Sequence, residues 1–247
     1  MAERLHNPLE GTAPDLTLDL HDGTNEQISI IVIHKDRPAH LNICLQSISV
    51  CSNNNNYEIV VVDNASGKES QEFLDDIKDE VTLVRNEKNL YWSSAANRGA
   101  DAANKNSKYL IFLHCDTVII NPGWIDLLVS VSQARSSGLV GIDQSSYYLQ
   151  GQKIDFIPEW CMLTTRDCWK ACGPFSEELP MIGHSFIYSF KAQKNGYSPQ
   201  VMKNPIVHHY HIFSLEDVSV WEKMLESASA NIPKLLRVIQ SDQLSIK

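Results

Sequence analysis

Four short apolar runs, each followed by a segment with helical spacing, constrain the fold of this chain more than any other feature. The runs lie at 28–33, 57–62, 81–84 and 109–113 and are rich in β-branched residues. Nearly continuous apolarity is typical of strands that are covered on both faces of a parallel sheet. We therefore expect a sheet that lies between helices.

The segments between the runs carry helical patterns. In the first of them Leu41, Cys44, Leu45 and Ile48 follow helix spacing. Further helices are expected at 68–77, 93–103, 124–134, near 185–195 and at 215–239. This order predicts an α/β fold with a mostly parallel, doubly wound sheet and right-handed crossovers. Beyond about residue 140 short strands and helices alternate irregularly, so the C-terminal half is expected to be mixed.

The 247 residues suit one main domain with additions at both ends. Residues 1–27 are polar and lack periodicity, which predicts an extended arm with at most a short strand at 16–20. Residues 28–214 carry the sheet pattern, and residues 215–247 form a helical extension. The apolar face of that extension, formed by Val218, Trp221, Met224 and Leu225, either packs on its own domain or contacts a second copy of the chain or a membrane surface.

Composition narrows the range of partners and locations. The formal net charge of -9 disfavours nucleic acid, because an acidic surface repels phosphate backbones. No apolar stretch reaches the roughly 20 residues of a membrane span, and no signal-peptide pattern opens the chain. The six cysteines form no CxxC pair, so buried free thiols are expected. These observations predict a soluble, cytoplasmic protein.

Two acidic residues follow predicted strands. Ligands of such sheets bind at the carboxyl ends of the strands, where Asp63 and Asp116 are found. Asp63 suits a ribose or a base, although by itself it suits the start of the next helix better, because aspartate is a favoured N-cap. Asp116 suits a hard divalent cation, or an ordinary turn.

A histidine cluster lies late in the chain, in the segment VHHYH at 207–211. In a strand, His209 and His211 would share one face and His208 would point the other way. Imidazole is a common metal ligand, although an ordinary polar strand would have the same pattern.

Seven segments in order resemble the inverting family 2 glycosyltransferases of GT-A fold, a Rossmann-like fold, and especially their bacterial rhamnosyltransferase-like branch. The segments are ISIIVIHKDRP, EIVVVDNAS, NEKNLYWSSAANRGADAA, YLIFLHCDTVIINPGW, WCMLTTRDCWKACGPFSEEL, GHSFIYSFKAQKNGY and IVHHYHIFS. Together they cover about residues 28–214. Each segment is a loose match by itself, but the common order makes the likeness specific.

The resemblance implies a nucleotide-diphosphate sugar donor held with a divalent metal ion, Mn²⁺ or Mg²⁺. It implies donor-binding roles for His34, Arg37, Asp63, Asn97, Arg98 and Asp116. Asp116 matches the last aspartate of the DXD-type motif that holds the metal ion. His209, or otherwise His211, matches the histidine that completes the site before Ser214.

The chain departs from the family pattern at three places. The DXD position reads His114-Cys115-Asp116, and Tyr91 stands where a glycine is usual. Tyr91 and Trp92 either stack on a ligand or fill the core. The acidic pair that normally supplies the general base is replaced by His184 and Ser185, so His184 is the expected base and Glu177 or Glu178 the weaker alternatives.

The prediction is a metal-assisted, inverting glycosyltransferase of polysaccharide biosynthesis, whose acceptor is a glycan, a lipid-linked sugar or another hydroxyl. The missing acidic pair favours the alternative, a catalytically degenerate module of the same fold that binds a nucleotide sugar or glycan. A sugar-nucleotide pyrophosphorylase is disfavoured because the loop HKDRPAH has no glycine for binding a triphosphate.

Overall fold

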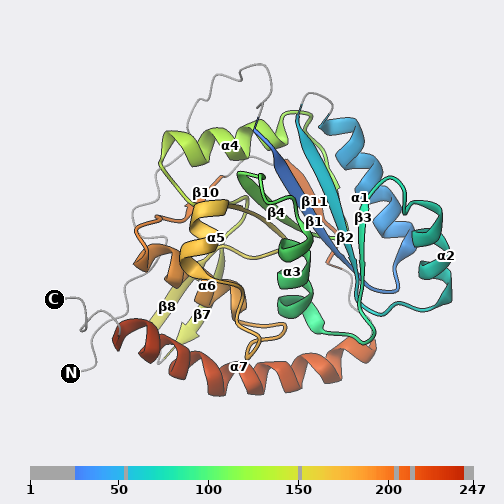
Figure 1. Cartoon of the computed structure of the whole chain (residues 1–247). Helices are drawn as coiled ribbons and strands as arrows, with labels where there is room; N and C mark the ends of the chain where they lie inside the picture. Colours follow the sequence, from blue (N-terminus) through green and yellow to red (C-terminus); the bar gives the residue numbers. More distant parts are fainter. Residues whose placement is uncertain (1–25, 53–54, 150–151, 203–205, 212–214, 242–247) are drawn as a thin grey trace.

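The computed structural model describes residues 26–52, 55–149, 152–202, 206–211 and 215–241 (Figure 1). Its centre is a seven-stranded sheet with the order β10-β6-β9-β4-β1-β2-β3. The strands are β1 (Ile28–His34), β2 (Tyr57–Asp63), β3 (Thr82–Arg85), β4 (Tyr109–His114), β6 (Leu139–Gly141), β9 (Cys161–Thr165) and β10 (Gln200–Val201). Strand β9 runs antiparallel to β4 and β6, and the other pairs are parallel. The predicted mostly parallel α/β sheet is confirmed.

Helices cover both faces of this sheet. One face carries α1 (Pro38–Cys51), α2 (Lys68–Asp76) and α4 (Trp124–Ala134), and the other carries α3 (Tyr91–Ala102), α5 (Arg166–Cys172) and α6 (His184–Lys194). Every residue of β1 is buried. Ile30 and Val32 pack with the first layer, whereas Ile31 and Ile33 pack with the second, because successive side chains of a strand point to opposite faces.

Smaller elements complete the mixed half. Two antiparallel ribbons form, one from β5 (Thr117–Ile119) and β11 (Val207–His209), the other from β7 (Ser145–Leu149) and β8 (Gln152–Phe156). All six cysteines are free and buried, as expected. Among the helices that the structure describes, none is both long and apolar enough to cross a membrane.

The C-terminal helix α7 (Leu215–Ser241) packs on its own chain and lies along one side of the molecule in Figure 1. Ala228, Ile232 and Leu236 join Phe186 and Phe190 of α6 in a separate apolar cluster. Of the residues expected on the buried face, Leu225 is instead 41% exposed. The side chains of Val218 and Trp221, Ser214, and the strand expected at 16–20 lie outside the described residues.

Helix α3 begins two residues earlier than expected. The side-chain oxygen of Asn89 accepts a hydrogen bond from the backbone N–H of Tyr91 (2.9 Å), and that of Asn64 accepts one from the N–H of Leu90 (2.8 Å). These bonds satisfy backbone donors at the start of the helix. Tyr91 has a φ of 58°, a conformation that favours glycine, so the residue that replaces the family's usual glycine keeps a glycine-like backbone.

Gly99 sets the distance between α3 and the sheet. A Cβ at this position would lie 2.9 Å from Cγ2 of Val62 and closer still to Cγ2 of Ile31. Both neighbours are buried and β-branched, so neither can turn aside easily. The helix approaches β1 and β2 this closely only because residue 99 has no side chain.

We expect Gly99→Ala to lower the free energy of unfolding by at least about 1 kcal/mol, because overpacking outweighs the gain in helix propensity. Urea denaturation measures the change. Gly67→Ala is the matched control, since its Cβ would make an ordinary contact at 3.5 Å with Asp36. Equal stability of the two variants would contradict this account of the interface between α3 and the sheet.

Candidate active site

The carboxyl ends of the central parallel strands bring the predicted site residues to one edge of the sheet. In the strand register His34 lies beside Asp63, and His114 lies beside Ile33. Strand β4 ends at His114, a turn follows, and β5 leads away from it. The edge is therefore lined by residues that come directly after the buried strands.

A pairing between distant segments adds the late histidine to this edge. Strand β11 pairs with β5 so that His209 lies opposite Thr117, and the N–H of Tyr210 donates to the carbonyl of Asp116 (3.0 Å). As a result Nε2 of His209 lies 3.1 Å from Oδ1 of Asp116, although 93 residues separate the two along the chain. Asp116 and His209 thus meet through backbone pairing.

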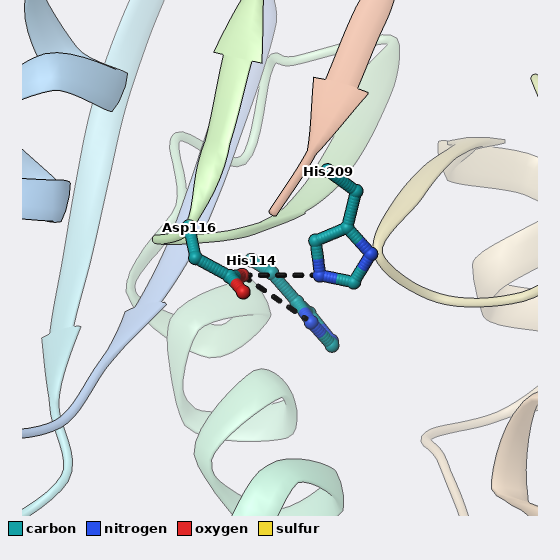
Figure 2. Close-up of side chains that lie close together, drawn as sticks. All are labelled: His114, Asp116 and His209. Atoms are coloured by element: carbon teal, nitrogen blue, oxygen red, sulfur yellow. Dashed lines mark hydrogen bonds and ion pairs between the residues drawn. The ribbon is translucent and has the colours of Figure 1, made fainter. Parts of the chain in front are cut away.

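His114 is the third member of the cluster (Figure 2). Its Nδ1 lies 3.9 Å from Oδ1 of Asp116, and one ligand atom from each of His114, Asp116 and His209 lies within 4.8 Å of the others. Nε2 of His114 and Nδ1 of His209 are buried and have no hydrogen-bond partner among the described residues. The cluster is one carboxylate with two imidazoles, a set of atoms that can ligate a divalent metal ion.

Burial keeps His114 neutral. Burial lowers the pKa of His114 to about 4, against the opposing attraction of Glu159. A histidine must be neutral to ligate a metal ion. His114 is therefore in a metal-competent form at neutral pH.

Aromatic side chains support His209. The indole of Trp160 stacks on its imidazole with ring centroids 4.9 Å apart and an interplanar angle of 17°. The ring of His211 lies 4.0 Å from that of His209, but His211 is exposed and falls outside the three-residue cluster. The structure therefore places His211 beside the cluster.

His184, the expected base, lies at the first turn of α6 and is almost completely buried, with 1% of its surface exposed. Its ring stacks on that of Trp92 at 4.5 Å and 16°. Trp92 is itself buried in the core, in line with the core-filling alternative. Burial lowers the pKa of His184, so the imidazole is neutral.

Glu159 is a site residue that the sequence did not reveal. Its Oε1 lies 3.6 Å from Nε2 of His184 and 3.9 Å from Nε2 of His114, and 19% of its side chain is exposed. Burial alone would raise the pKa of Glu159, but the imidazoles of His184 and His114 and the hydroxyl of Ser185 outweigh it and lower that pKa. Glu159 precedes β9, whose antiparallel direction brings its first residue to the edge where β4 ends. The sequence does not reveal the direction of β9, so it contained no signal that placed Glu159 in the site.

The predicted donor-binding residues Asp63, Asn97, Arg37 and Arg98 differ in their burial and in their hydrogen-bond partners. Oδ1 of Asp63 accepts a hydrogen bond from the N–H of Ser66 (3.0 Å), which stabilises the loop before α2. The Asn97 amide binds the backbone of Phe175 through both its oxygen (2.9 Å) and its nitrogen (3.0 Å). Arg37 is half-buried at the start of α1, and Arg98 is exposed on α3.

The remaining carboxylates predicted as alternatives, Glu177 and Glu178, follow α5 and are both exposed. Glu177 contacts the Asn97 amide at 3.5 Å. Glu178 is exposed, and its backbone carbonyl accepts a hydrogen bond from Asn231 of α7 (3.2 Å). These contacts join the two residues to α3 and α7, not to the cluster of His114, Asp116 and His209.

Comparison with known sequences matches residues 29–156 to the family described as Glycosyl transferase family 2. A curated relative, the O-antigen biosynthesis protein RfbC of Myxococcus xanthus, is 30% identical over 119 residues. That stretch is 47% of this chain but 9% of the relative, so this chain spans a small part of that protein.

Solved structures share the fold at low sequence identity. The mannosyltransferase PcManGT from Pyrobaculum calidifontis, in complex with GDP-Man and Mn²⁺, has a TM-score of 0.58 and 16% identity over 77% of this chain and 57% of its own. TarS 1-349 of S. aureus in complex with UDP also has a TM-score of 0.58 and 16% identity, and the match covers 90% of this chain and 72% of that one.

His34 provides a pH-dependent contribution to stability. It is fully buried, and its two ring nitrogens have no hydrogen-bond partner within the described part of the chain. Burial lowers the pKa of His34 from 6.5 to about 4, although Asp63 and Asp36 oppose the shift. Between these pH values the unfolded chain binds a proton at His34 and the folded chain does not.

We therefore expect His34 to reduce the free energy of unfolding by up to about 1.4 kcal/mol per pH unit as the pH falls through this interval. In His34→Leu that contribution should vanish, so acidification should lower the stability of the wild type relative to that of the variant. Urea denaturation at several pH values measures this. Parallel curves for the two proteins would show that His34 is not held neutral.

Proposed function

This chain belongs to glycosyl transferase family 2, and from that membership we propose that it transfers a sugar from a nucleotide-diphosphate donor to a hydroxyl acceptor, with inversion and the help of a divalent metal ion. The observation that carries the proposal is the cluster of His114, Asp116 and His209 at the carboxyl edge of the sheet. The structural neighbours solved with GDP-Man and Mn²⁺ and with UDP support a nucleotide-sugar donor. The O-antigen relative supports a glycan or lipid-linked glycan as acceptor.

We place the nucleoside above the ends of β1 and β2. Asp63 and His34 form the floor there, and Arg37 and Arg98 supply positive charge for the diphosphate. The amide of Asn97 already binds the backbone of Phe175, so its role in donor binding is to shape the wall. Asp116, His209 and His114 would hold the metal ion, because Nε2 of His209 and Nδ1 of His114 both face Oδ1 of Asp116. When bound, the ion supplies positive charge for the leaving diphosphate.

The proton of the acceptor requires a base. In an inverting transfer the acceptor oxygen forms a bond to the anomeric carbon, the bond to the diphosphate breaks, and the hydroxyl proton leaves. We propose that the pair formed by His184 and Glu159 accepts this proton. His184 is buried, so we take Glu159, whose Oε1 lies 3.6 Å from Nε2 of His184, as the member that faces the acceptor. Glu178 is the alternative base.

The second candidate is a binding module of the same fold without transferase activity. The absence of a carboxylate at residues 184 and 185 favours it. Both candidates bind a nucleotide sugar, and only the first releases the nucleotide diphosphate. Incubating the chain with UDP- and GDP-linked sugars and measuring the free nucleotide therefore separates them.

A bound donor should raise the melting temperature of the wild-type chain by about 5–10 °C when present at about 100 times its Kd with Mn²⁺. We expect Asp116→Ala to lose this stabilisation, because the carboxylate at the centre of the cluster is gone. His208→Ala is the matched control, since His208 is exposed on the same strand as His209. Thermal shifts with a panel of UDP- and GDP-linked sugars test both points, and an unchanged shift in Asp116→Ala would argue against its role.

Glu159→Gln should lower the rate of sugar transfer about 10²- to 10⁴-fold while leaving donor affinity within about a factor of three, because the amide preserves shape but cannot accept the proton. Single-turnover transfer and calorimetry with the donor measure the two quantities. A comparable loss in Glu178→Gln, with Glu159→Gln fully active, would assign the base to Glu178.

A further inference from the structure

The histidine at residue 114 changes the chemistry of the cluster. Where the family resemblance has a carboxylate, this chain has an imidazole whose Nδ1 faces Asp116 at 3.9 Å, and His209 faces the same oxygen at 3.1 Å. Ligands about 2.1 Å from a shared ion lie roughly 3–4 Å apart, so small side-chain movements would close the set around one ion. Figure 2 shows the three side chains pointing toward one another.

The surroundings of His114 resemble those of metal-ligating histidines. Such histidines usually direct their second ring nitrogen at a carboxylate, which fixes the orientation of the ring. Here Nε2 of His114 faces Oε1 of Glu159 at 3.9 Å. On the other side of the cluster, Trp160 stacks on His209. Two of the three ligands therefore have neighbours that restrict their orientation.

The donor set favours some ions over others. Mg²⁺ prefers oxygen ligands in a nearly ideal octahedron, whereas imidazole suits the later first-row ions such as Co²⁺ and Zn²⁺. The cluster offers two imidazole nitrogens and one carboxylate. We propose that His114 is a metal ligand and that it makes this site select a borderline transition-metal ion over Mg²⁺. The inference rests on the proposed function insofar as both use the same metal site.

The test measures binding of Co²⁺ alone and Mg²⁺ alone to the full chain by calorimetry, without nucleotide and without a polyhistidine tag. We expect wild type to bind Co²⁺ at least about tenfold more tightly than Mg²⁺, and His114→Asp to reduce this ratio by at least about tenfold. His208→Asp makes the same chemical change at an exposed histidine of β11 and should leave the ratio unchanged. The visible absorption of bound Co²⁺ should change in His114→Asp and not in the control.

Equal affinities for Co²⁺ and Mg²⁺ in wild type, or an unchanged ratio in His114→Asp, would overturn the proposal. Circular dichroism checks the fold of the variant. His114→Asn provides a second, uncharged replacement if His114→Asp does not fold. Sugar transfer is not part of the readout. A chain that binds Co²⁺ through His114 but never releases nucleotide diphosphate would retain this inference and contradict the proposed transferase activity.

Discussion

Burial of β1 on both faces is the constraint from which the rest of this structure follows. All seven of its residues are buried, and it pairs with β2 on one side and β4 on the other. A strand with no face toward solvent needs an apolar layer above and below, which the two groups of helices supply. Polar side chains are then confined to the ends of the strands, so the chemistry of the chain gathers at one edge of the sheet.

Imidazoles replace carboxylates at two places on that edge. His114 stands at the DXD-type position, and His184 stands where the acidic pair is expected. Both are kept neutral by burial, and the carboxylate of Glu159 lies between them. Fewer negative charges therefore crowd this edge than in a site with a full set of carboxylates. The two departures form one connected arrangement, because a single carboxylate oxygen faces both rings.

The fold could be predicted well because it depends on local patterns. The apolar runs predicted β1, β2 and β4 to within a residue, and α4 begins and ends where its periodicity does. Prediction was weaker where tertiary contacts decide. The start of α3 depends on side chains of Asn64 and Asn89, and the buried face of α7 depends on its fit against α6. Such contacts join residues that are far apart along the chain, and a local pattern of apolar residues carries no information about them.

The sequence by itself determined the layered α/β fold, and its ordered motifs predicted the family. Both depend on local sequence patterns, namely the apolar runs and the residues that directly follow them. Only the tertiary structure decided which side chains meet. The pairing of β5 with β11 brings His209 to Asp116, and the antiparallel direction of β9 brings Glu159 between His114 and His184. Strand direction and long-range register result from the packing of the whole sheet, so no single segment encodes them.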